Sequence, residues 1–218
     1  MVATQQRTRI VLVRHGHVEG IDPPRFRGRV NLPLTARGVR QAELTRDYLA
    51  QTFRPAAVYT SPLARCVRTG EILAQPFALT TSAIADFVDI DYGAWQGKSY
   101  DEVQAAEPAA FSRWRWTPHL AEIPEGETLH DLAARVVRVM HAIVAANRRQ
   151  TVLLVGHDTV NRVSLLLALD ASLARFWCIG QQPCAVNVLE FDETTGWIVQ
   201  SLNETGHLRE RILSHDRA

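Results

Sequence analysis

The 218-residue sequence predicts an α/β fold, a three-layer sandwich whose mostly parallel sheet has helices on both faces and one antiparallel edge strand. The aliphatic run Ile10–Val13 and the similar run Thr151–Val155, which is aliphatic after its first residue, are typical of strands buried on both faces of a parallel sheet. Helical patterns alternate with these strands. Two late strand patterns, Ala185–Phe191 and Trp197–Leu202, predict a hairpin at the antiparallel edge.

The first half of the chain predicts a strand, a loop and two helices. The polar segment Glu19–Pro33, rich in glycine and proline, indicates a loop over the end of the first strand. Thr35 is typical of an N-cap and precedes a helix over Ala36–Ala50. A short strand at Ala57–Thr60 leads into a helix running from the cap Ser61, which is followed by proline, to Leu73.

The second half predicts mostly helix between the two remaining strand regions. Glycines rule out a long helix over Asp86–Gly97. Two short helices are expected at Tyr100–Glu107 and Pro108–Trp116, and a long amphipathic helix at Leu129–Ala146. A last helix, Thr159–Leu169, follows the second buried strand.

Composition and length favour one soluble domain over residues 1–218. A net charge of +1, from 24 basic and 23 acidic residues, argues against nucleic acid or an anionic membrane as the main partner. The polar first nine residues and the lack of a long apolar segment predict no leader or membrane span. Cys66, Cys178 and Cys184 show no CxxC spacing, which favours a reduced, cytoplasmic setting.

Both buried strands end in residues suited to chemistry. Arg14, His15 and Gly16 follow the first strand, and His157 follows the second. Because ligands bind at the carboxyl ends of parallel strands, the two histidines are expected to face each other across one crevice. A guanidinium beside an imidazole suits a phosphoryl group. The alternative, that Arg14 and His15 simply point into solvent, is weakened by the second histidine.

Arginines near this edge could extend an anion site. Arg65 lies early in its helix, where free backbone N–H groups and the helix dipole favour negative charge, although a surface position is the plainer alternative. Of the loop arginines Arg25, Arg27 and Arg29, one could contact a substrate, while the usual alternative is a solvated face.

These segments together resemble branch 1 of the histidine phosphatase superfamily, which has the phosphoglycerate mutase-like fold. The matching segments keep the family's order and span nearly the whole chain. They are Arg14-His15-Gly16, Leu32–Gly38 with Gln41-Ala42, Ser61–Arg65 with Thr69, Asp89–Gly97, Pro124–Thr128 and Gly156-His157.

The resemblance implies a role for each site residue and no metal or cofactor. His15 would be the nucleophile that carries a phosphohistidine. Arg14, Arg65 and His157 would bind the phosphoryl oxygens. His157 would also be catalytic, together with His15 and Asp89. Asp89 would protonate the leaving alkoxide and then activate water. The implied partner is a small phosphorylated metabolite.

The chain departs from the family pattern at several positions. Val18 and Ile21 stand where the family often has polar residues of the phosphate pocket. The acid is Asp89 where the family usually has glutamate, so Glu19 or Asp91 could share its role. The sequence does not identify the phosphomonoester, and it leaves the oligomeric state open, a homodimer included.

Three other functions compete with a phosphatase. A metal-dependent hydrolase is suggested by the HxH pair His15 and His17, but Arg14 would repel a divalent cation. A non-catalytic phosphate-binding module would keep the pocket without turnover. A phosphoglycerate mutase is disfavoured, because the tryptophan and asparagines after the first histidine and the longer insertion before the glycine-rich turn are lacking.

Overall fold

The structure, a computed structural model, describes residues 7–209 and contains one six-stranded sheet within them. Its order is β3-β2-β4-β1-β5-β6. The strands are β1 (Thr8–Arg14), β2 (Ala57–Thr60), β3 (Thr81–Ala83), β4 (Thr151–Gly156), β5 (Val186–Asp192) and β6 (Gly196–Glu204). The first four are parallel to one another, whereas β5 runs antiparallel to both β1 and β6. The predicted mostly parallel sheet is confirmed, with its antiparallel strand β5 one position inside the edge strand β6.

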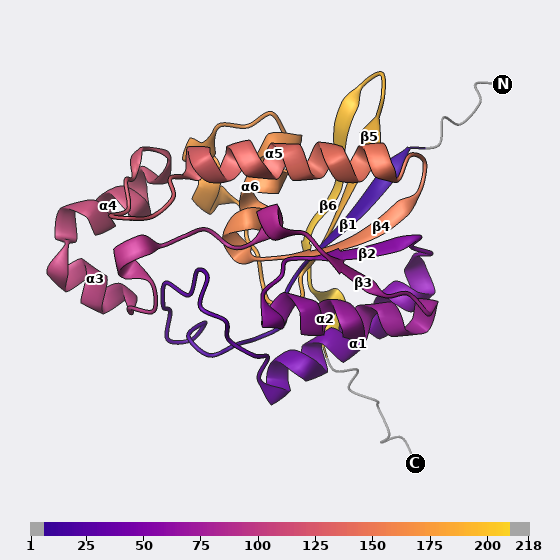
Figure 1. The fold of residues 1–218 in the computed structure, drawn as a ribbon, viewed down its shortest axis with the longest axis horizontal. Coiled ribbons are helices and arrows are strands. Elements are labelled where there is room, and N and C mark those ends of the chain that lie inside the picture. Colours follow the sequence, from indigo (N-terminus) through magenta and orange to yellow (C-terminus); the bar gives the residue numbers. More distant parts are fainter. Residues whose placement is uncertain (1–6, 210–218) are drawn as a thin grey trace, which may run out of the picture.

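Helices cover both faces of this sheet (Figure 1). On one face lie α1 (Ala36–Thr52) and α2 (Ala64–Ala74), and on the other α5 (Leu129–Ala146) and α6 (Asp158–Ala168). Side chains of β1 alternate between the two: Val11 packs with Leu49 of α1, and Leu12 with Val136 of α5. Burial on both faces explains why β1 and β4 are unbroken aliphatic runs.

Two short helices, α3 (Tyr100–Ala106) and α4 (Pro108–Trp116), lie beyond the end of the sheet (Figure 1). Ser99 and Glu102 form a capping box at the start of α3, and Pro108 is the first residue of α4. Trp114 is buried, whereas Trp116, two residues along the same helix, is 79% exposed. The buried indole packs with the rings of Phe26, Tyr92, Phe176 and Trp177.

The predicted start of α2 is wrong. The helix begins at Ala64, and Leu63 occupies the cap position without a side-chain cap bond. Ser61 does not cap the helix because its hydroxyl is engaged elsewhere, 2.7 Å from Nε2 of His157. Strand β3 was not expected either, since Thr81-Ser82-Ala83 is too short and polar to show a strand pattern.

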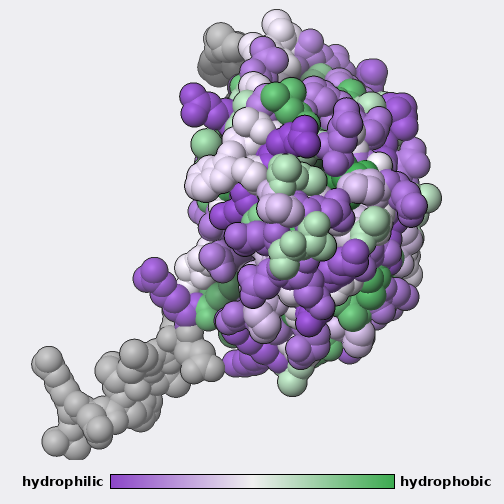
Figure 2. Space-filling model, turned by 90° about the vertical axis from the view of Figure 1, so that its left-hand side faces the viewer, coloured by the Kyte–Doolittle hydropathy of each residue, from purple (hydrophilic) through white to green (hydrophobic). Residues whose placement is uncertain are grey.

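Short 3-10 helices complete the described elements. They are Gln75–Phe77, Ala85–Phe87, Gly93–Trp95, Pro118–Leu120, Leu173–Cys178 and Gly206–Leu208. Across residues 7–209, no helix combines the length and the apolar character that crossing a membrane requires. The face that carries α3 and α4 is mainly hydrophilic, with hydrophobic side chains scattered over it (Figure 2).

Candidate active site

The two histidines meet because their strands are neighbours. In the parallel pairing of β1 with β4, Arg14 stands opposite Gly156, so each histidine comes one residue beyond that pair. The backbone N–H of His15 continues the ladder, donating to the carbonyl oxygen of Gly156 over 3.0 Å. The ring centroids of His15 and His157 lie 5.3 Å apart, and both side chains are buried. The expected juxtaposition of the histidines is confirmed.

His15 is held as a neutral imidazole with one free lone pair. Its Nδ1 lies 2.7 Å from the carbonyl oxygen of Gly16, which can only accept, so Nδ1 carries the proton. Burial, followed by the charges of Arg65 and Arg14, lowers the pKa of His15 well below its usual value. Nε2 is therefore unprotonated, the form that a nucleophile requires.

Arg14 offers an unused donor in the same place. Its guanidinium is buried, donates from Nη1 to the carbonyl oxygen of Gln181 and lies 3.9 Å from Oδ1 of Asp158. Its Nε has no partner among the described residues. Because a buried N–H without an acceptor is costly, an anion that reached this donor would bind favourably.

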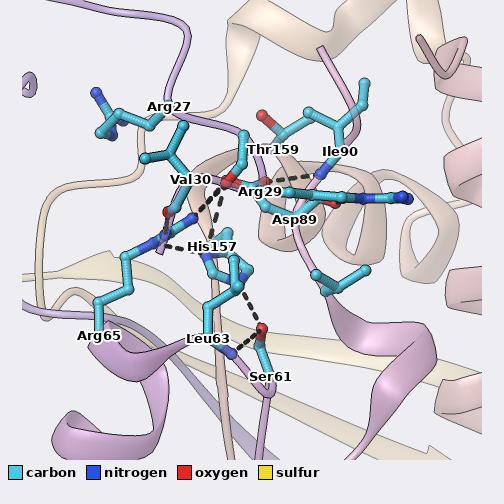
Figure 3. A network of polar contacts seen from close by, with 12 residues as sticks. Arg27, Arg29, Val30, Ser61, Leu63, Arg65, Asp89, Ile90, His157 and Thr159 are labelled. Atoms are coloured by element: carbon cyan, nitrogen blue, oxygen red, sulfur yellow. Dashed lines mark hydrogen bonds and ion pairs between the residues drawn. The ribbon is translucent and has the colours of Figure 1, made fainter. Parts of the chain in front are cut away.

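Arg65 is fully buried and ties the site together, so its surface alternative is wrong (Figure 3). Nη1 and Nη2 donate to the carbonyl oxygens of Val30 and Gly28, each over 2.7 Å. Nη2 also reaches Oδ2 of Asp89 over 3.2 Å, and Nε reaches Nδ1 of His157 over 3.2 Å. One guanidinium thus positions the loop, the carboxyl group and the second histidine.

Asp89 lies within this network, and the other two candidate acids do not. Its Oδ2 is 3.6 Å from Nδ1 of His157, and its Oδ1 accepts from its neighbour's N–H. Burial raises the pKa of Asp89, and the nearby charge of Arg65 only partly opposes it. Asp91 instead pairs with Arg29 over 3.0 Å, and Glu19 is exposed.

Several supporting residues carried no functional prediction. Thr69 accepts the backbone N–H of Gly16 over 3.2 Å, and the Tyr92 hydroxyl meets Oγ1 of Thr159 over 3.1 Å. Thr69 belongs to a matching motif, whereas the contact of Gln181 with Arg14 leaves no signal in the sequence because it is made by a main-chain carbonyl.

Two departures from the family pattern, and one loop arginine, also have a place in the structure. Val18 is fully buried and adds no polar group to the site, while Ile21 is half-buried in the loop. Among the loop arginines, the charge of Arg27 acts on His15 and Asp89. Arg25 pairs with a carboxylate outside the site, as Arg29 does.

The HxH pair does not form a metal-binding cluster. Nδ1 of His15 is bonded to Gly16, and Nδ1 of His17 lies 2.9 Å from Oγ1 of Thr35, the cap of α1. Within the described part of the chain, no three His, Cys, Asp or Glu side chains lie close enough to hold a metal ion.

Comparisons with known proteins relate the chain to one family. The model of the histidine phosphatase superfamily (branch 1) matches residues 10–205. A bifunctional protein of Mycobacterium tuberculosis is 33% identical over 201 residues, 92% of this chain and 55% of that protein, so the chain spans about half its length. Phosphoserine phosphatase 1 of Hydrogenobacter thermophilus is 30% identical over 210 residues, 96% of this chain and 99% of that protein. The solved structure of YhfR from Bacillus stearothermophilus aligns with a TM-score of 0.87 at 27% identity, covering 93% and 100% of the two chains.

Proposed function

Because the chain belongs to branch 1 of the histidine phosphatase superfamily, we propose that it hydrolyses a small-molecule phosphomonoester through a phosphohistidine on His15. One observation carries the proposal: the free Nε2 lone pair of His15 and the unpartnered Nε of Arg14 belong to adjacent residues at one strand end. A nucleophile and an oxyanion donor side by side are what phosphoryl transfer requires. The enzyme would be a phosphoric monoester hydrolase of the histidine acid phosphatase type.

In the first step, Nε2 of His15 attacks phosphorus and the bond to the leaving oxygen breaks. Arg14 donates to the phosphoryl oxygens as negative charge develops, and Arg65 and His157 line the rest of the phosphoryl site. Asp89, whose pKa is raised by burial, gives its proton to the departing alkoxide.

In the second step, the same carboxylate accepts a proton from water, which attacks phosphorus. The bond between phosphorus and His15 breaks, and inorganic phosphate leaves. The proximity of Asp89 to Arg65 and His157 supports this double role, because one carboxyl group at the leaving-oxygen side can serve both steps.

The names of the relatives suggest which substrates to test. Phosphoserine is the first ester to test, since a relative that matches nearly the full length is named a phosphoserine phosphatase. We further propose that residues 1–218 act as a single cytoplasmic domain, without a metal or another cofactor, and that monomer and homodimer are both compatible with the site.

A panel of phosphorylated metabolites, assayed for released phosphate with and without a chelator, tests the proposal. Phosphoserine, 3-phosphoglycerate, a sugar phosphate and p-nitrophenyl phosphate cover the main leaving groups. We expect at least one ester to be hydrolysed equally well with chelator, and His15→Ala to be inactive on it. Phosphate release that depends on an added metal would contradict the mechanism, and no release from any ester would favour a binding module.

A further inference from the structure

The partners of the two ring nitrogens of His157 fix where its proton lies. Nδ1 is 3.2 Å from Nε of Arg65, which carries a hydrogen and can only donate. Nδ1 must therefore accept, and the single proton of a neutral imidazole stands on Nε2. Nε2 lies 2.7 Å from Oγ of Ser61, which accepts that proton in a short hydrogen bond.

Ser61 is held rigidly as this acceptor (Figure 3). The residue is fully buried just beyond β2, and its backbone N–H donates to the carbonyl oxygen of Val155 over 3.0 Å. The N–H of Leu63 also points at the Ser61 Oγ, at 3.4 Å. Ser61 is thus hydrogen-bonded to β4, the strand that precedes His157, so the distance between its hydroxyl and the imidazole is fixed.

An empty site consequently offers no N–H from His157 to a ligand. Its one proton points away, toward Ser61, and Nδ1 acts as an acceptor. Burial and the charge of Arg65 lower the pKa of His157 well below its usual value, so the ring is neutral. A bound oxyanion raises the pKa of His157 again, because negative charge beside the ring favours the imidazolium form.

We propose that Ser61 is a positioning residue that makes anion binding proton-coupled. By accepting the Nε2 proton, it allows His157 to take up a second proton at Nδ1 when an oxyanion enters the site. That Nδ1–H donates to the anion, and Nε of Arg65 is released toward the same ligand. The proton comes from solvent or from a monoprotonated ester, and it leaves with the product. The inference rests on the proposed function only in taking the site to bind a phosphoryl group.

Titratable and charged groups from every neighbouring element affect the protonation of His157. They are Arg65 and Cys66 of α2, Asp89 of the acid segment, His15 and Arg14 at the end of β1, and Arg27 of the loop. The arginines oppose the imidazolium form in the empty site, whereas the carboxyl group and a bound dianion favour it. His15 and Asp89 could themselves take up a proton, so the test must remove both.

Calorimetry with sulfate in buffers of different ionisation enthalpy measures this proton uptake. Sulfate is a suitable probe because it is fully ionised at neutral pH and carries no proton into the site. With the double variant His15→Gln and Asp89→Asn as background, we expect uptake of about one proton per sulfate bound near pH 7.5. Uptake close to zero in this background would overturn the proposal.

Variants of Ser61 test whether its hydroxyl stabilises the protonated form of His157. Ser61→Ala removes a hydrogen bond to a charged ring, so the pH at which proton uptake occurs should fall by about one to two units. The basic limb of the kcat profile should fall equally on p-nitrophenyl phosphate, whose leaving group hardly needs the Asp89 proton. Ser61→Thr keeps the hydroxyl and should restore both. Ser164→Ala is the matched control, because this buried hydroxyl bonds only to the backbone of Val160 in α6. An unchanged limb in Ser61→Ala would contradict the inference.

Nitrogen NMR of the wild-type rings keeps the proposal testable if Ser61→Ala fails to fold. We expect His157 to show a proton on Nε2 alone in the free protein and on both nitrogens with sulfate. A neutral Nδ1–H form would overturn the inference. Turnover through His15 without proton uptake would count against this inference alone, whereas uptake without turnover on any ester would count against the proposed function alone.

Discussion

The Cα atom of Gly38 lies so close to the carbonyl oxygen of His17 that a Cβ atom there would overlap it. This contact packs the first turn of α1 against the segment that follows His15, and a Cβ on Gly16 would likewise overlap the carbonyl oxygen of Gly38. The backbone after His15 is therefore positioned by two glycines in mutual contact.

We predict that Gly38→Ala destabilises the protein by about 1–3 kcal/mol, because the new methyl group must displace main chain on one side. It should also lower kcat, since the displaced segment begins directly after His15. Denaturant midpoints and steady-state kinetics measure both effects. Gly206→Ala is the control, because a Cβ there meets no atom within 4 Å. Equal stability of the two variants would refute the packing argument.

Trapping experiments should find phosphate on His15. An acid-labile, base-stable phosphoenzyme is expected during turnover and should vanish in His15→Ala, with kcat reduced by at least about 1000-fold. The prediction includes an intact fold, checked by circular dichroism, because His15 lies just beyond the last residue of β1 and its side chain is not part of the aliphatic core. A label on serine or aspartate would place the nucleophile elsewhere.

Asp89→Asn should slow alkyl phosphates much more than p-nitrophenyl phosphate, whose leaving group hardly needs a proton. We expect a loss of about 100-fold or more on an alkyl ester, with Glu19→Gln and Asp91→Asn changing little. The raised pKa of Asp89 sets the sign of the pH effect: the acid is lost, and alkyl-ester turnover falls, as pH rises through that pKa. Equal losses on both esters would indicate another acid.

The two buried histidines should make the fold sensitive to mild acid. Folding lowers the pKa of both His15 and His157, so below their unfolded value, about 6.5, the unfolded chain binds protons that the folded chain excludes. Stability should therefore fall as pH drops below about 6.5. His15→Gln should reduce that slope by about 1.4 kcal/mol per pH unit, and addition of His157→Gln by as much again. An unaltered slope in the double variant would show that the folded protein protonates both rings.

Incubation with 3-phosphoglycerate and 2,3-bisphosphoglycerate should give phosphate release or no reaction, and no efficient isomer formation. A mutase must shield its intermediate from water, which requires a cover that closes over the site. Here the candidate cover is limited to α3 and α4, of 7 and 9 residues. Following both isomers and inorganic phosphate distinguishes the outcomes, and bisphosphate-dependent isomerisation without phosphate release would make the protein a mutase.

The sheet was predictable because its central strands are buried on both faces and their residues report that burial. Helix α5 was predictable over its whole length, since the apolar stripe along its 18 residues is a local feature. The convergence of His15, His157, Arg65 and Asp89 followed from topology and motif order together. The partners of those groups did not, because Ser61 shows the same letter whether it caps a helix or accepts from an imidazole.

The pairing of β1 with β4 also fixes the spacing of the two histidines independently of the outer segments of the chain. The spacing of the two imidazoles is one interstrand step, set by main-chain hydrogen bonds in the middle of the sheet. The loop after β1 and helices α3 and α4 lie outside that ladder, and we expect them to surround the leaving group. Changes in the length or sequence of those outer segments would therefore alter which alcohol group is accepted without moving the two histidines. Related proteins could then keep the same pair of imidazoles and differ in substrate.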